Sequence, residues 1–226
     1  MSEGVPDFQA LRAMYHQEVE GLSDAQLDWE DSSEEWSRWS IRRQVSHVAL
    51  AYFFWWVKMW GKTLWPDGPP EDPVDFTKAA PNQYDRRLDE EKYWKLEDLL
   101  PKFDEAIHFA ERAAEGKSAD ELKALAITRS FKPELLMGDT DLPVYRFWMH
   151  ASTFHDEGIA QDTEDETKFT YTLAGMLRQL YWEALVHLRT IHRLKIKQGL
   201  TPAAQIPREG LLLDPFFWGP EDEPRM

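Results

Sequence analysis

The spacing of hydrophobic residues along the chain predicts four long helices and almost no strand. Apolar side chains recur every three or four positions in residues 7–22, 40–60, 98–116 and 171–197. This period gives a helix one apolar face that packs against a core. Strict alternation of apolar and polar residues, which is typical of a half-buried strand, is nearly absent. The sequence therefore predicts an all-α fold.

Capping residues set the predicted ends of these helices. Asp7 and Ser40 are the first residues of the first two segments and can accept hydrogen bonds from free amides of the first turn. Gly61 and Gly199 follow two of the segments, and glycine commonly ends a helix. Pro101 falls in the first turn of a helix that begins near residue 98, where its missing amide hydrogen is tolerated.

The segments between the long helices are shorter and less regular. Residues 118–125 open with Ser-Ala-Asp-Glu, the form of a capping box, and predict a short helix. A further helix is expected from about Asp141, with Pro143 in its first turn. Residues 65–90 are rich in proline and aspartate at their start and are expected to form a long surface loop.

The chain is expected to form one domain, because we find no internal repeat and no second core. Residues 1–226 would form this domain, with an extra helical insertion at about 118–170 and an irregular tail at about 199–226. The tail carries large apolar side chains among prolines, including Phe216 and Trp218. We expect the tail to wrap around the helices or to be buried in a partner.

The last long segment places two ionisable residues within an apolar stripe. One helical face carries Met176, Leu180, Glu183, His187, Ile191 and Leu194. Residues four apart have Cβ atoms about 6 Å apart, so the carboxylate and the imidazole can reach one ion. His47 lies in the inward-facing region of the second helix. A His, Glu and His set is a common way to bind zinc with a free coordination position, and an ion would offset the cost of burial.

A structural role is the alternative interpretation of these residues. Glu–His pairs at i,i+4 are often surface hydrogen bonds, and a lone histidine beside an apolar face is often a core residue. His192 competes as a ligand, but it lies about 140° round the helix from His187 and is interpreted as a flanking residue. The other histidines are not expected to be ligands: His16, His108, His150 and His155.

Composition narrows the expected partners. The 26 basic and 41 acidic residues give a formal net charge of −15. Nucleic acids and anionic membrane surfaces need concentrated positive charge, so neither is an expected partner. The chain has no cysteine, which excludes disulfides, thiolate ligands and a cysteine nucleophile. The most apolar window, residues 48–57, is about half the roughly 20 residues of a membrane span, and the N-terminus lacks a signal-peptide pattern. We therefore expect a soluble, cytoplasmic protein.

Two stretches resemble the DinB-like four-helix metalloprotein superfamily: WSRWSIRRQVSHVALAYFFWW and TLAGMLRQLYWEALVHLRTIH. Members typically show Trp-Ser, a hydrophobic helix start and a histidine six or seven residues later. Their last helix opens with Thr-Leu, and its two ligands follow at i and i+4. The matching positions are Trp39, Ser40, His47, Thr172, Leu173, Glu183 and His187. Glutamate at the first position of the pair is similar to the branch of mycothiol-dependent maleylpyruvate isomerase.

The resemblance implies a fold and a chemistry. Members form an up-down-down-up four-helix bundle with an open metal near one end, and many are homodimers. Characterised relatives are mostly metal-dependent transferases or isomerases that use low-molecular-weight thiols, and some are hydrolases. We therefore expect zinc or nickel on His47, Glu183 and His187, a small-molecule substrate and a homodimer. The chain departs from the family after the last ligand, where Leu-Arg-Thr follows His187 in place of the common Arg-Gly-Gln.

Two questions stay open at this stage. The fold could bind a ligand or a partner protein without catalysis, and the polar trio would then be a remnant. The aromatic segment at residues 52–60 could line a substrate pocket, but a core and dimer interface is the favoured interpretation, because aromatic residues dominate both settings.

Overall fold

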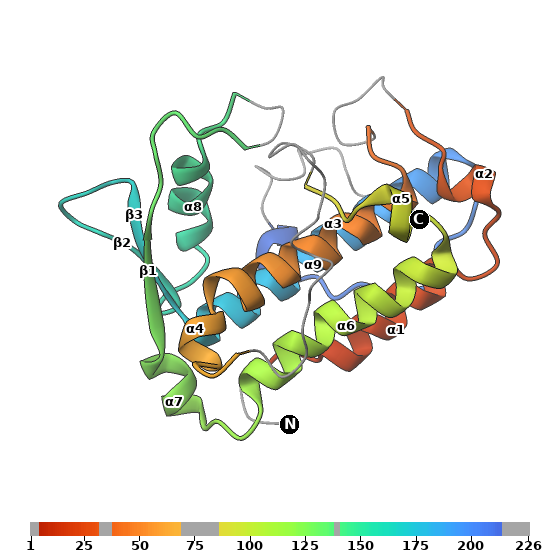
Figure 1. The fold of residues 1–226 in the computed structure, drawn as a ribbon. Helices are drawn as coiled ribbons and strands as arrows, with labels where there is room; N and C mark the ends of the chain where they lie inside the picture. The colour runs from red at the N-terminus through yellow and green to blue at the C-terminus, as the bar shows by residue number, and fades with distance from the viewer. Residues whose placement is uncertain (1–4, 32–37, 69–85, 138–140, 214–226) are drawn as a thin grey trace.

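The computed structural model describes residues 5–31, 38–68, 86–137 and 141–213, and this part of the chain is mostly helical (Figure 1). Helix α1 contacts α6 and α9, and α3 contacts the same two helices, so the four form a ring of neighbours. The predicted stripes face inward, and Val45 and Leu180 have no exposed surface. The bounds are α1 (Phe8–Val19), α3 (Ile41–Phe53), α6 (Leu96–Ala114) and α9 (Leu173–Lys197).

The helix ends mostly follow the predicted caps. Asp7 Oδ1 accepts a hydrogen bond from the amide of Ala10 at 2.9 Å, and Ser40 caps α3. Helix α6 begins two residues earlier than expected, so Pro101 lies in its second turn and not in its first. The missing amide hydrogen of Pro101 therefore removes one intrahelical hydrogen bond of α6.

The prediction that Gly61 ends the second helix is wrong. After α3 the chain continues as a π-helix (Phe54–Met59), where the amide of Trp60 donates to the carbonyl of Trp55 at 2.9 Å. Gly61 is then the first residue of α4 (Gly61–Leu64). The wider turn keeps several aromatic side chains on the inner side, and Trp55, Trp56 and Trp60 are all buried.

A small antiparallel sheet corrects the all-α prediction. It contains β1 (Ala126–Ser130), β2 (Ile159–Gln161) and β3 (Lys168–Thr172), in the order β1-β3-β2. Phe169 and Tyr171 are buried and Thr170 between them is exposed, which is the period of a strand. The insertion is thus mixed and not purely helical. Along the chain, β1 follows α7 (Ala119–Ala124), and β2 and β3 follow α8 (Val144–Ser152) and precede α9.

The predicted short helices are present with small shifts. Ser118 and Glu121 form the expected capping box of α7, and Pro143 lies just before α8 instead of within its first turn. The expected loop at residues 65–90 lies largely outside the described residues. Its end forms α5 (Glu90–Tyr93), and a further short helix, α2 (Asp24–Leu27), follows α1.

The described part of the tail wraps back along α9, as one of the two expectations had it. Leu211 and Leu212 are buried in a short 3₁₀ helix, η4 (Gly210–Leu213), which contacts α9. Gly210 has φ of 54°, and a Cβ there would collide with the ring of Trp182, so both backbone and packing require glycine. Phe216 and Trp218 lie outside the described residues.

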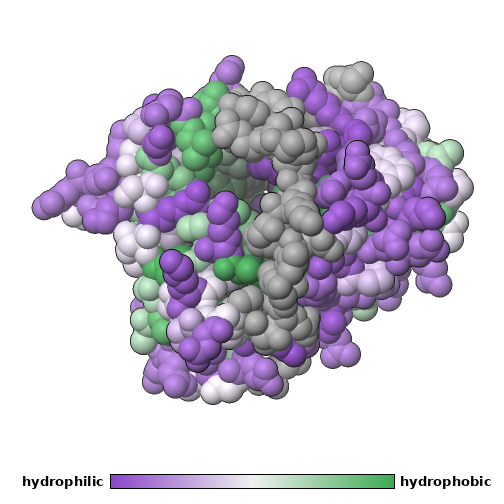
Figure 2. Space-filling model, in the orientation of Figure 1, coloured by the Kyte–Doolittle hydropathy of each residue, from purple (hydrophilic) through white to green (hydrophobic). Residues whose placement is uncertain are grey.

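The surface is largely hydrophilic on the face seen in Figure 2, with hydrophobic residues gathered near α8 and the segment before it. The exposed large apolar side chains in this area are Leu135, Leu136 and Met149. Among the described residues, no helix combines the length and the apolar character needed to cross a bilayer.

Candidate metal centre

Helices α3 and α9 lie side by side and bring His47, Glu183 and His187 together (Figure 1). One ligand atom from each residue lies within 4.8 Å of the other two. His47 Nε2 is 3.8 Å from Glu183 Oε1, and the two imidazole rings have centroids 4.6 Å apart. The structure therefore joins the three residues that the sequence picked out as ligands.

Helix α3 is fixed at its N-terminal end by a buried arginine. Arg42 is 1% exposed, and its guanidinium bonds to the carboxylates of Asp24 and Asp28 and to the carbonyl of Trp94. Charge-assisted hydrogen bonds of this kind are stronger than neutral ones. They tie α3 to α2 and to the segment before α6, so His47 projects from a rigid element.

Each histidine has a protein acceptor at Nδ1. His47 Nδ1 donates to the carbonyl oxygen of Arg86 at 2.6 Å, and His187 Nδ1 donates to Gln44 Oε1 at 2.6 Å. An acceptor at Nδ1 places the proton there and leaves the Nε2 lone pair free. Metal-binding histidines usually have such a partner at the second ring nitrogen, which sets the tautomer and the ring orientation. Both rings are thus prepared to bind a cation through Nε2.

Gln44 is itself oriented for this contact. Its Nε2 donates to the carbonyl of Trp39 at 3.3 Å, which turns its Oε1 toward His187. Gln44 lies three residues before His47 on α3, so one turn of this helix supplies both a candidate ligand and the hydrogen-bond acceptor for the other histidine.

Burial keeps His187 in the form that binds metals. Desolvation lowers its pKa well below the ordinary value of 6.5, and the electrostatic effects of the neighbouring His47 and Arg86 act in the same direction. A neutral imidazole at neutral pH is the ligand form. The Glu183 side chain is 24% exposed, so the centre communicates with solvent on that side.

Two tyrosines lie beneath the carboxylate. The Tyr15 hydroxyl donates to the carbonyl of Ala184 at 2.7 Å, and the Tyr52 hydroxyl is buried without a partner among the described residues. Burial, followed for Tyr15 by the charge of Glu183, raises the pKa of both well above 10.0. Both hydroxyls therefore stay protonated, and Glu183 is the only anionic member of the described site.

The donor set fits a divalent ion after a small contraction. Two nitrogens and a carboxylate oxygen suit zinc and similar ions, and donors about 2.1 Å from a tetrahedral ion are about 3.4 Å apart. The present separations reach 4.8 Å. Side-chain shifts of about 1 Å would close the set, and the partly exposed Glu183 has room for such a shift.

The other histidines contact residues outside the candidate metal centre. His192 Nε2 contacts Glu18 Oε1 at 2.9 Å, and His155 is buried with its Nε2 2.9 Å from Gln179 Oε1. The placement of His192 agrees with its interpretation as a flanking residue. His108 pairs with Glu111, and the ring of His150 lies beside Phe154.

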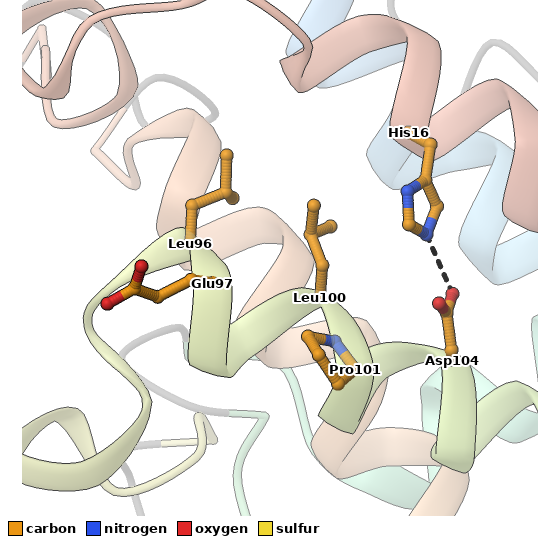
Figure 3. Close-up of a pocket in the computed structure, with 6 residues that line it drawn as sticks. All are labelled: His16, Leu96, Glu97, Leu100, Pro101 and Asp104. Carbon is orange, nitrogen blue, oxygen red and sulfur yellow. Dashed lines mark hydrogen bonds and ion pairs between the residues drawn. The ribbon is translucent and has the colours of Figure 1, made fainter.

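His16 lines an open hollow between α1 and α6 and pairs with Asp104 across it at 2.8 Å (Figure 3). Both side chains are about 40% exposed, at 42% and 36%. The remaining lining is largely apolar and comes from α6, with Leu96 and Leu100. His16 and His108 are partly solvated as expected, but each has an acidic partner.

The sequence interpretation missed the supporting residues of the centre. Gln44 was not singled out, although its position one turn before His47 was a usable signal. The carbonyl of Arg86 could not have been found, because a backbone acceptor leaves no trace in residue type.

No protein-family model matches the chain, and no significant match was found among curated proteins or solved structures.

Proposed function

We propose that His47, Glu183 and His187 hold a divalent metal ion. The observation that carries this proposal is the pairing of both Nδ1 atoms with acceptors while the free Nε2 atoms and the carboxylate converge. Two neutral imidazoles and one carboxylate leave coordination positions for further ligands. Zinc and nickel are the ions proposed, because imidazole nitrogen suits both.

We further propose that the chain belongs to the DinB-like superfamily and has its four-helix bundle. The ring of contacts among α1, α3, α6 and α9 supports this proposal. The matched positions have supporting roles as well. Ser40 caps α3, and the Thr172 hydroxyl accepts the amide of Gly175 at 3.0 Å as the cap of α9. The sheet between α7 and α9 is an addition to such a bundle.

The proposed activity is that of a metal-dependent enzyme on a small molecule, either a thiol-dependent transferase or isomerase, or a hydrolase. A bound divalent ion lowers the pKa of a coordinated thiol or water, which supplies a nucleophile at neutral pH. The residues of this chain orient the ion and bind the substrate. Gln44 and the Arg86 carbonyl fix the imidazoles, and the solvent-exposed side of Glu183 marks the approach for a ligand.

The metal is tested by elemental analysis of protein purified without chelator. We expect about one zinc or nickel ion per chain, with loss of that ion in His47→Ala and in Glu183→Gln. His108→Ala is the matched control, because it removes a histidine that is partly exposed and pairs with Glu111. Full occupancy in both ligand variants would contradict the proposed ligand set.

The two activities are separated by the requirement for a thiol. Metal-loaded protein is assayed on a panel of electrophiles with glutathione, mycothiol or bacillithiol, and on a panel of esters and amides without thiol. Turnover that requires one thiol favours transfer or isomerisation, and turnover without thiol favours hydrolysis. Metal binding without turnover in either panel would favour the alternative of a non-catalytic binding module.

A further inference from the structure

Arg86 lies beside the candidate metal centre without a carboxylate partner among the described residues. Its Cζ is 5.7 Å from the centroid of the Trp39 ring, and its buried Nε has no hydrogen-bond partner in the part of the chain that the structure describes. Arg87 lies over the same ring at 5.6 Å but pairs with Glu90 at 3.1 Å. Two neighbouring arginines thus contact the same indole ring, but only Arg87 also pairs with a carboxylate among the described residues.

The main chain of Arg86 is tied to the metal centre. Its carbonyl accepts the Nδ1 proton of His47, and the amide of Leu88 donates to Ser46 Oγ at 2.9 Å. Consecutive residues of α3 therefore hold both ends of the 86–88 segment. The Trp39 ring that supports the guanidinium is itself 5.0 Å from the His47 ring. The cation is consequently a fixed neighbour of the ligands, and its charge acts on His187.

The charges around the centre favour an anionic ligand. A divalent ion bound by one carboxylate and two neutral imidazoles retains a formal charge of about +1, which is the ion charge less that of Glu183. The guanidinium of Arg86 adds another positive charge. Five N–H donors in a planar fork match a carboxylate. The cation–π contact with the Trp39 ring helps to hold the guanidinium near the centre.

We propose that Arg86 binds the carboxylate of an acidic small-molecule ligand whose other end reaches the metal position. The centre thereby selects anionic ligands over neutral ones of the same shape. This inference rests on the proposed metal function and adds the substrate class to it. Arg86 is then a contact residue for the ligand, whereas Arg87 is held by Glu90.

The test measures binding to cobalt-substituted protein. The probes are mercaptoacetate, 3-mercaptopropionate and 6-mercaptohexanoate, each compared with its methyl ester, and the readout is the sulfur-to-cobalt charge-transfer band. The chain has no cysteine, so a thiolate band reports only the added thiol. The three chain lengths sample the spacing between the cobalt and the guanidinium.

For at least one length, the acid is expected to bind the wild type about tenfold more tightly than its ester. Arg86→Gln should remove this preference, so that the acid and its ester bind with similar affinity. Arg87→Gln is the matched control, because it removes the same charge from the same ring and should keep the preference.

Two failures are distinguishable. A protein that takes up no cobalt would contradict the metal function and this inference with it. Cobalt-loaded wild type that binds acids and esters equally at all three lengths would overturn the role of Arg86 alone. A preference that persists in Arg86→Gln would overturn it as well.

Discussion

Helix α9 takes part in two carboxylate–histidine clusters that differ in how their polar atoms are satisfied. The first is the Glu18 network, formed by Glu18, His192, Lys195 and the amides of Ala203 and Ala204. Glu18 has no exposed surface. Its Oε1 accepts from His192 at 2.9 Å and from both amides, and its Oε2 accepts from Lys195 at 2.7 Å. This network is closed, and it joins α1, α9 and the segment that follows α9.

In the candidate metal centre, by contrast, only some of the polar atoms have hydrogen-bond partners, and we call this cluster open. The outward Nδ1 atoms of both histidines are paired, but the inward atoms have only each other. His47 Nε2 and Glu183 Oε1 are 3.8 Å apart, which is too long for a hydrogen bond. A cluster whose polar atoms are all paired stabilises the fold, whereas a cluster with unpaired donor atoms is arranged to bind a ligand such as a cation. The comparison thus separates a structural glutamate from one prepared to bind a ligand.

The largest expected effect is on stability, in the Glu18 network. Glu18→Gln leaves the ammonium of Lys195, which is 4% exposed, without its counter-charge. Removing one partner of a buried ion pair costs about 3–5 kcal/mol, so the free energy of unfolding in urea should fall by about that amount. Glu183→Gln in metal-free protein should change it by less than about 1 kcal/mol, because among the described residues Glu183 lies near His47 but pairs with no buried lysine or arginine.

Glu157→Gln is the control for the substitution itself. Glu157 pairs with Lys123 at 3.5 Å on the surface, where such pairs contribute little. Equal losses in Glu18→Gln and Glu183→Gln would remove the distinction between the two clusters.

The contributions of the two clusters to the stability of the protein should also be lost in different pH ranges. Bonds from His192, Ala204 and Lys195 outweigh desolvation and lower the pKa of Glu18 from 4.5 to about 2. Between these values the unfolded chain binds a proton that the native protein does not. The contribution of Glu18 is therefore complete above about pH 4.5 and is lost as the pH falls to about 2, a loss of about 3 kcal/mol.

The contribution of His187 to the pH dependence of stability falls at higher pH than that of Glu18. Burial lowers its pKa below 6.5, so below that pH the unfolded chain takes up a proton that the metal-free native protein excludes. Stability should therefore decrease as the pH falls below about 6.5. Urea unfolding across pH 2–8 should show the lower loss disappear in Glu18→Gln and part of the upper loss disappear in His187→Gln. A single loss common to both variants would contradict this assignment.

Added zinc should stabilise the protein against unfolding only through the candidate metal centre, and not through the Glu18 network. Free zinc at one hundred times its dissociation constant should raise the free energy of unfolding by about 2.7 kcal/mol. Glu183→Gln should lose this increment, while Glu18→Gln should keep it above a lower baseline. The measurement is urea unfolding with buffered zinc and with chelator. An increment that survives in Glu183→Gln would show zinc binding elsewhere.

The sequence could reveal the open cluster because its proposed ligands interrupt an apolar stripe. Glu183 and His187 lie one turn apart on a face that is otherwise buried, and His47 occupies an inward position on α3. Helical period alone places such residues. The Glu18 network was not predicted, because its partners come from residues about 180 positions away and include backbone amides. Tertiary contacts of this kind have no local pattern.

The sheet was missed for a related reason. Its strands have three to five residues, which is too short for alternation of apolar and polar residues to be distinguished from a chance pattern. Phe169 and Tyr171 face the core only because β1 and β2 flank β3, and pairing between distant segments cannot be read from a single short run. The long helices were predictable because their period repeats over several turns.

The smallest expected effect concerns the hydrogen bond that supports His187, one of the proposed metal ligands. Gln44→Met removes the acceptor of the His187 Nδ1 proton, so the ring loses its fixed tautomer and orientation. Loss of such a partner typically lowers metal affinity by about tenfold, equivalent to about 1.4 kcal/mol. Competition with a chromophoric chelator measures the dissociation constant for zinc. The matched control is Gln179→Met, which removes the amide bonded to His155, a histidine of neither cluster. If the network around His187 prepares it for a cation, Gln44→Met weakens zinc binding and Gln179→Met does not. Equal affinities in the two variants would mean that Gln44 only fills space between α3 and α9.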